Sequence, residues 1–238
     1  SRVCWNVELS EPKYAPIIVR AGEAWERLER AAGMPLRDKT GVLIFGQETS
    51  QQMQRAVDTA ALTGAEIEQL SHQELTKRFP QFAFGQNDVG VWDVAGAAIK
   101  PELTVATAAR LAERAGAIIH HFDPVTGIEL ETTGALVTTA SGSKKYDRVV
   151  VAAGGWTPKL LPYLKQEVVA RRLTSAWYFA ENPDYFKGFP PFLQSAPEYC
   201  YGLPSSDGFS VKVGFGFNDH YVTGDPDSLP RELKGEAL

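Results

Sequence analysis

One run of residues, Arg148-Val149-Val150-Val151-Ala152-Ala153 followed by Gly154-Gly155, constrains the fold more than any other part of the chain. Five consecutive apolar residues without polar alternation are typical of a strand that is buried on both faces. Such strands occur mostly in parallel sheets whose two faces are covered by helices. Two glycines then end the run, as happens where a backbone passes close to a ligand. The run therefore predicts a parallel sheet with a ligand site at its end.

Helix and strand patterns alternate before this run. Apolar residues at helical spacing, with prolines in first turns and glycines at the ends, predict helices over 15–32, 51–63, 71–78 and 101–115. Ser71 and Glu74 form the pattern of a capping box. Shorter apolar or alternating runs predict strands at 40–45, 89–94, 118–121, 127–133, 135–139 and 148–153.

The pattern changes after Val168. Alternating segments joined by turns, at 168–180, 191–194, 199–203 and 209–217, predict an antiparallel sheet that is rich in aromatic residues. Two architectures in one chain favour two interleaved domains. We therefore expect an α/β (α+β) fold.

Composition excludes several classes of protein. The net charge is −5, and no lysine or arginine run forms a surface that would track phosphates, so we expect no nucleic acid partner. No apolar stretch reaches the length of a membrane span, so we expect no membrane partner either. Two cysteines, Cys4 and Cys200, are too few for a disulfide framework and are expected to be buried reduced thiols in a cytoplasmic protein. Four histidines lack metal-ligand spacing, so no metal site is predicted.

Lys212 is the first candidate for chemistry. Val211 and Val213 flank it in an alternating strand, so the lysine points to the opposite face from both valines. It is either a solvated lysine on an exposed sheet face or a cation held over a cofactor or substrate. The pattern alone leaves both interpretations open.

Several motifs in order resemble the monomeric sarcosine oxidase and N-methyltryptophan oxidase type of FAD-dependent amine oxidase, in the D-amino acid oxidase superfamily. The stretch Tyr199-Cys200-Tyr201-Gly202-Leu203-Pro204-Ser205 with Val211-Lys212-Val213-Gly214 resembles a Tyr-Tyr-Gly-Phe-Pro-Ser stretch and its Gly-Leu-Lys-Leu-Gly strand. Thr40-Gly41-Val42-Leu43-Ile44-Phe45-Gly46 resembles another strand of that family. The run that ends in Gly154-Gly155-Trp156 resembles its second flavin-contacting strand. The resemblance covers essentially the whole chain.

The resemblance implies an architecture and an activity. A partial FAD-binding Rossmann-like domain, 1–37 and 95–165, would be interleaved with an antiparallel substrate domain, 38–94 and 166–238. The implied reaction oxidises the C–N bond of a secondary amine or N-substituted amino acid, with FAD as cofactor, oxygen as acceptor and peroxide as product.

The resemblance also assigns roles to residues. Lys212 would promote the reaction of reduced flavin with oxygen through its positive charge, and Arg2 would lie beside the flavin. Tyr201 would line the substrate pocket. The backbone of Val125 would meet the adenine, and Gly154, Gly155 and Trp156 would contact FAD.

Departures from the family pattern concern the substrate and the ends of the chain. Trp5 stands where the family has a carboxylate-binding arginine, and Gly216 stands where it has a histidine. These two residues favour a larger amine than sarcosine, although Trp5 could equally be a core residue.

A Gly-x-Gly-x-x-Gly turn is absent from the sequence, as is the flavin-linking segment expected after Lys212. We therefore expect part of a longer enzyme that is inactive alone. The alternative is a non-catalytic module that binds a small molecule or a partner. A serine hydrolase is disfavoured, because Ser141-Gly142-Ser143 suits a hairpin turn rather than a nucleophile elbow.

Overall fold

A computed structural model describes residues 2–196, 198–205, 208–216 and 223–230. The chain divides into two compact units, each made of two segments. Unit 1 comprises Ser1–Ala117 and Thr174–Phe217, and unit 2 comprises Ile118–Leu173 and Asn218–Leu238. The predicted functional division into 1–37 with 95–165 and 38–94 with 166–238 stays a prediction.

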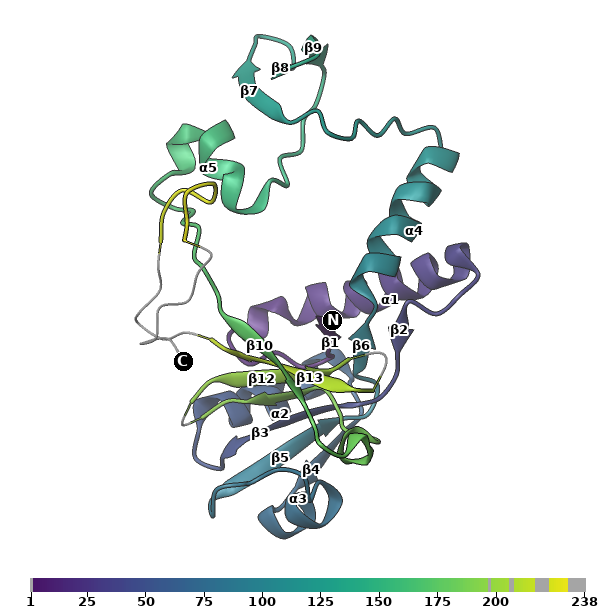
Figure 1. The fold of residues 1–238 in the computed structure, drawn as a ribbon, viewed down its shortest axis with the longest axis vertical. Coiled ribbons are helices and arrows are strands. Elements are labelled where there is room, and N and C mark those ends of the chain that lie inside the picture. Colours follow the sequence, from purple (N-terminus) through teal and green to yellow (C-terminus); the bar gives the residue numbers. More distant parts are fainter. Residues whose placement is uncertain (1, 197, 206–207, 217–222, 231–238) are drawn as a thin grey trace. The chain divides into compact units, whose positions relative to one another are not determined.

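The centre of unit 1 is a seven-stranded sheet with the order β10-β13-β12-β11-β3-β5-β4 (Figure 1). All neighbouring strands are antiparallel except β11 and β3, which run parallel. The predicted antiparallel sheet is confirmed for β10 to β13, and it continues into three strands from residues 42–93. Its strands are β3 (Val42–Gln47), β4 (Ile67–Leu70), β5 (Asp88–Asp93), β10 (Ser175–Phe179), β11 (Phe192–Gln194), β12 (Cys200–Pro204) and β13 (Ser210–Phe215).

A second, three-stranded sheet in unit 1 has the order β1-β6-β2, with both pairs antiparallel. Its strands are β1 (Arg2–Cys4), β2 (Arg37–Asp38) and β6 (Ala97–Ile99). These strands were not expected, because two or three residues are too few to show a period of two.

The predicted helices of unit 1 are confirmed to within one residue at each end. Gly33 ends α1 and Gly64 ends α2, both in the left-handed conformation that glycine adopts without strain. Ser71 and Glu74 form the predicted capping box before α3. The helices are α1 (Ala15–Ala32), α2 (Gln51–Thr63), α3 (His72–Arg78) and α4 (Pro101–Arg114), with short 3-10 helices η1 (Pro12–Tyr14) and η4 (Pro183–Phe186).

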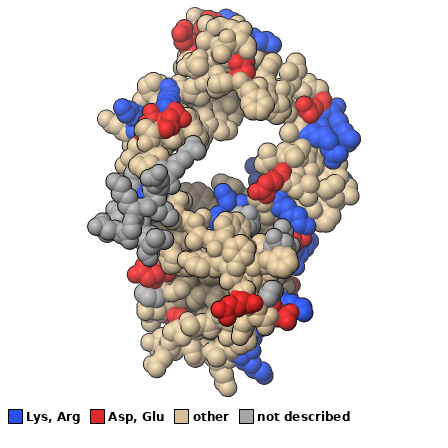
Figure 2. Space-filling model, in the orientation of Figure 1, with Lys and Arg blue, Asp and Glu red and all other residues tan. Residues whose placement is uncertain are grey.

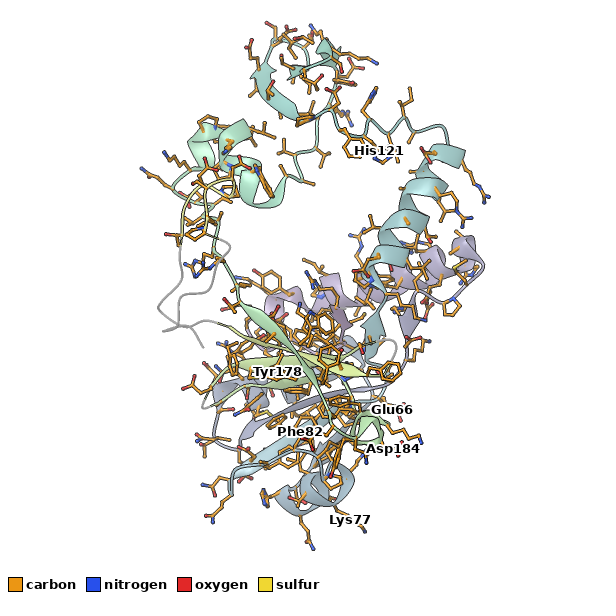
Figure 3. The ribbon with its side chains drawn as sticks, in the orientation of Figure 1. Glu66, Lys77, Phe82, His121, Tyr178 and Asp184 are labelled. Carbon is orange, nitrogen blue, oxygen red and sulfur yellow. The ribbon has the colours of Figure 1, made fainter. Side chains whose placement is uncertain are left out.

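The two faces of the seven-stranded sheet carry different cores. One face packs against α2 through Val42, Ile44, Val91 and Leu193, together with Val7 from the N-terminal segment. The opposite face packs against α3 and is largely aromatic, with Phe82 among the rings (Figure 3). Because side chains alternate along each strand, residues on outer strands can be assigned to one face or the other from the pairing register.

Unit 2 contains a three-stranded antiparallel sheet with the order β7-β8-β9 (Figure 1). The predicted hairpin is confirmed, and a third strand extends it beyond the turn at residues 140–141. The elements are β7 (Val125–Leu130), β8 (Ala135–Thr139), β9 (Gly142–Tyr146), α5 (Thr157–Leu160), η2 (Gly154–Trp156) and η3 (Pro162–Leu164).

Two predicted strands are wrong. Residues 118–121 and 148–153 form no strand and pair with no described strand, and Val150, expected to be buried on both faces, is 92% exposed. A central strand of a parallel sheet exists only through hydrogen bonds to neighbours on both sides. The described part of unit 2 offers no such neighbours, so the apolar run stays outside any sheet.

Charged side chains are mixed on the molecular surface. Figure 2 shows lysines and arginines in small groups among acidic residues on the face it displays. In the described part of the chain, no helix is long and apolar enough to cross a membrane.

Candidate functional site

Lys212 lies on β13 and shares its face of the sheet with two aromatic residues, Trp177 and Tyr201. It stands opposite Trp177 on β10 and opposite Leu203 on β12. Tyr201 stands opposite Gly214, two residues along β13 from the lysine, and therefore lies on the same face. We call Lys212, Trp177 and Tyr201 the Lys212 patch. Tyr201 also pairs with Leu193 on β11, and Leu193 belongs to the core cluster under α2. The Lys212 patch therefore lies on the same face of the sheet as α2.

The electrostatics of the patch favour a negative charge. Burial lowers the pKa of Lys212, and the nearby positive charge of Arg2 lowers it further. Arg2 comes from β1, where it pairs with Ile99. The structure therefore brings together the two cations that the sequence proposed. Lys212 is half-buried and Arg2 is exposed, and an anion near Lys212, or negative charge that develops there during a reaction, would stabilise its charged form.

Two glycines shape the aromatic wall beside Lys212. A Cβ atom on Gly214 would lie 2.4 Å from Cζ of Tyr201, so only glycine leaves room for this ring. A Cβ atom on Gly216 would lie 2.6 Å from Cδ1 of Tyr199. The ring of Tyr199 thus lies against Gly216, at the position where the family has a histidine. The two tyrosine rings are tilted, with centroids 6.5 Å apart.

The N-terminal segment is anchored to the sheet by a buried carboxylate. The backbone N–H of Asn6 donates to Oδ2 of Asp93 at 2.6 Å, and Nδ2 of Asn6 donates to Oδ1 at 3.0 Å. Asp93 has no exposed surface, and burial raises the pKa of its carboxyl although these bonds oppose the shift. Thr63 on α2 also donates to the carbonyl of Asn6, at 2.9 Å. Arg2 and Trp5 are therefore carried by a firmly held segment.

Trp5 packs within unit 1. It lies against the core cluster under α2 and also lines a cavity of about 180 Å³ beside Ile18 and Trp25 of α1. These contacts support the core interpretation of Trp5, while its role toward a substrate stays a prediction.

A larger cavity, of about 740 Å³, lies within unit 2. Val125 and Trp156 line it, as does the unpaired run Val149-Val150-Val151-Ala152-Ala153. Gly154 and Gly155 follow this run directly, and Gly154 has a φ of 53° that favours glycine. The four residues that the sequence assigned to a cofactor thus lie around or next to one cavity.

Comparison with known proteins decides the family. A family model described as FAD dependent oxidoreductase matches residues 3–235. The chain belongs to this family. The resemblance inferred from the sequence is confirmed at this level, and so is the expectation of FAD as the family's cofactor.

Curated relatives of this FAD dependent oxidoreductase include two kinds of oxidase. N-methyl-L-tryptophan oxidase from Citrobacter koseri is 30% identical over 205 residues, which is 85% of this chain and 54% of the relative. Monomeric sarcosine oxidase from Streptomyces avermitilis is 26% identical over 238 residues, covering 98% of this chain and 62% of the relative. The chain therefore spans little more than half the length of the curated relatives it matches.

Solved structures confirm the fold class. The open form of NikD, described as an unusual amino acid oxidase, superposes with a TM-score of 0.72 at 21% identity, over 99% of this chain and 62% of that one. Glycine oxidase from Geobacillus kaustophilus gives a TM-score of 0.69 at 16% identity, over 96% of this chain and 60% of that one.

The cavity of unit 2 fits part of an FAD molecule. Its wall is made mainly of valine and alanine side chains, which suit a flat heteroaromatic ring. The backbone of residues 149–152 makes no hydrogen bond to another described residue. Its N–H and C=O groups are therefore open to the polar edge of such a ring.

Sequence reasoning missed three residues of these sites: Trp177, Asp93 and Asp227. Trp177 and Asp93 act through pairing partners that are far away in the sequence, which no local pattern reveals. Asp227 lines the cavity of unit 2 and comes from a Pro- and Gly-spaced segment that offered no periodic signal.

Proposed function

We propose that this chain is part of an FAD-dependent oxidase that acts on the C–N bond of a secondary amine or N-substituted amino acid. In this reaction the amine loses two electrons and two protons to become an imine, and oxygen takes up the same number to become hydrogen peroxide. FAD, when bound, supplies the electron-carrying ring. Relatives named for sarcosine and N-methyl-L-tryptophan support this substrate class.

The Lys212 patch is the observation that carries the proposal. A half-buried ammonium group with the charge of Arg2 nearby supplies positive charge on this face of the sheet, although both burial and Arg2 lower the pKa of Lys212. Negative charge develops on oxygen as it is reduced, and a preorganised cation lowers the free energy of that state. Lys212 is therefore the residue that activates oxygen, and Arg2 holds a second charge beside the reacting ring.

The substrate would lie against the aromatic side chains of unit 1. Tyr201 supplies a flat, half-buried ring on the lysine's face, and Trp5 supplies a second apolar surface from the N-terminal segment. Gly216 admits the ring of Tyr199, which adds to this wall. Aromatic walls of this kind favour an amine with an apolar or aromatic substituent.

Unit 2 would hold the adenosine end of FAD. Val125, Gly154, Gly155 and Trp156 bind it together with the open backbone of residues 149–152. A cytoplasmic location, consistent with the free thiols of Cys4 and Cys200, belongs to the same proposal.

The test separates the two half-reactions in the full-length protein. Flavin absorbance is followed first during anaerobic mixing with N-methyl amino acids, and then after oxygen is added, while peroxide is measured directly. Lys212→Met is expected to slow reoxidation about a hundredfold while flavin reduction changes little. Lys77→Met is the matched control, because Lys77 is exposed on α3 and points away from the sheet (Figure 3). Equal slowing of both half-reactions would contradict the role of Lys212. A protein without bound flavin or peroxide production would instead favour a non-catalytic binding module.

A further inference from the structure

Residues 223–230 pass over the turn that contains Gly154 and Gly155 in unit 2, and we call these residues the strap. Thr223 pairs with Arg171 in an isolated bridge, and Nη1 of Arg172 donates to the carbonyl of Pro230 at 2.7 Å. A Cβ atom on Gly155 would lie 3.7 Å from Cβ of Pro226, so the strap packs closely on the turn. In the sequence, the strap comes after β13, which contains Lys212, and after Gly216.

Two carboxylates in the middle of the strap, Asp225 and Asp227, bind the segment that follows the turn. Oδ1 of Asp227 accepts a hydrogen bond from Nε1 of Trp156 at 2.8 Å. Lys159, one helical turn further on, contacts Oδ1 of Asp225 at 2.8 Å and also pairs with Asp227. Of these two carboxylates, Asp227 contacts both Trp156 and Lys159, whereas Asp225 contacts Lys159 and makes no hydrogen bond to the indole.

Trp156 and Asp227 both line the cavity that fits FAD. An indole has a single donor and no acceptor, so one strong acceptor is enough to fix the edge that carries Nε1. The ring's second torsion is otherwise broad and roughly twofold. A carboxylate is the strongest acceptor available to it, because the bond is charge-assisted.

We propose that Asp227 is a positioning residue for the cofactor: it fixes the indole of Trp156 as a wall of the FAD cavity. The inference rests on the proposed location of FAD in unit 2. The second contact of Asp227, with Lys159, keeps the carboxylate turned toward the indole. The role of Asp227 is thus separable from that of Asp225, whose bonds hold Lys159 and the strap's own turn.

The test measures FAD affinity rather than activity. Full-length apoprotein is titrated with FAD, and flavin fluorescence gives the dissociation constant. Asp227→Leu and Trp156→Phe are each expected to weaken FAD binding about threefold to tenfold, the range expected for one exposed hydrogen bond. The double variant should be no weaker than either single variant, because both remove the same bond. Asp227→Asn keeps an acceptor and should restore most of the affinity, while Asp225→Asn should leave it unchanged.

The outcomes separate this inference from the proposed site. Val150→Glu places a charge in the cavity wall at a position that is 92% exposed, so it should abolish FAD binding without unfolding the protein. If Val150→Glu binds FAD normally, the location of FAD in unit 2 is wrong. If Val150→Glu loses FAD while Asp227→Leu binds FAD like the wild type, the positioning role is wrong and the site in unit 2 stands. The same conclusion follows if the effects of Trp156→Phe and Asp227→Leu on FAD binding add.

Discussion

Asp93 anchors the segment that carries Arg2 and Trp5, and we predict that Asp93→Ala destabilises the protein strongly. The carboxylate accepts hydrogen bonds from the backbone N–H of Asn6 and from its side-chain amide. Replacing it by a methyl group leaves these donors without their acceptor. Both donors belong to Asn6, which is half-buried, so water can replace their lost bonds only in part.

The magnitude follows from these two donors of Asn6. A buried donor that loses its partner costs about 1–3 kcal/mol. Removing the carboxylate also removes its own desolvation cost, which is large enough to raise the pKa of Asp93 and offsets part of the loss. We therefore expect the free energy of unfolding to fall by about 2–4 kcal/mol.

Urea unfolding of the full-length protein, followed by tryptophan fluorescence, measures this change. Asp58→Ala is the control, because Asp58 is an exposed carboxylate that accepts one bond, from Gln54 at 2.8 Å. It should cost less than about 0.5 kcal/mol. The free energy of unfolding of Asp93→Asn should lie between those of wild type and Asp93→Ala. An amide offers one acceptor oxygen, but its NH₂ group faces the other donor of Asn6.

The pH dependence of the free energy of unfolding tests whether burial raises the pKa of Asp93. A carboxyl whose pKa is raised in the folded state contributes stability that is complete below its unfolded pKa and is lost as pH rises through the folded pKa. Asparagine does not titrate, so the stability gap between wild type and Asp93→Asn should narrow as pH rises. A gap that widens with pH, or a cost of Asp93→Ala no larger than that of Asp58→Ala, would refute the reasoning.

Two further predictions concern the Lys212 patch. Gly214→Ala puts a methyl group 2.4 Å from Cζ of Tyr201 and must displace the ring. KM for the amine should therefore rise several-fold, while FAD binding is unchanged. The steric control is Gly22→Ala on α1, where no atom beyond the adjoining helix backbone lies within 4 Å of the new methyl. If Gly214→Ala leaves KM unchanged, Tyr201 does not line the substrate site. Because burial and Arg2 lower the pKa of Lys212, flavin reoxidation should slow as pH rises through that lowered pKa. Lys212→Arg should move this decline to higher pH, since a guanidinium stays charged; an unchanged pH profile would show that another group controls the reaction.

Local signals in the sequence were enough to locate most elements. Prolines, glycines and the Ser71 capping box marked the helix ends, because these residues act on the backbone next to them. Alternation located β13 and put Lys212 on the face opposite its valine neighbours. The partners of that strand could not be predicted, because pairing between β10, β12 and β13 depends on register rather than on local pattern.

The unpaired valine run shows the limit of such signals. Residues 148–153 have the composition of a central strand, yet a strand is defined by its neighbours. The same run lines a cavity instead, together with Trp156 and Asp227. Apolar composition therefore predicted a strand buried on both faces, whereas the run is unpaired and Val150 is 92% exposed.

The parallel pairing of β3 with β11 has a consequence for biosynthesis. Leu43 donates to the carbonyl of Pro191, and the N–H of Ser195 donates to the carbonyl of Phe45, so the two strands close a very long loop. On the ribosome, β3 emerges long before β11 and can pair only with β5 in the meantime. Its second edge, flanked by fully buried side chains such as Leu43 and Ile44, stays bare in the nascent chain. Until β11 is synthesised, this bare edge is therefore a site at which the nascent chain can aggregate.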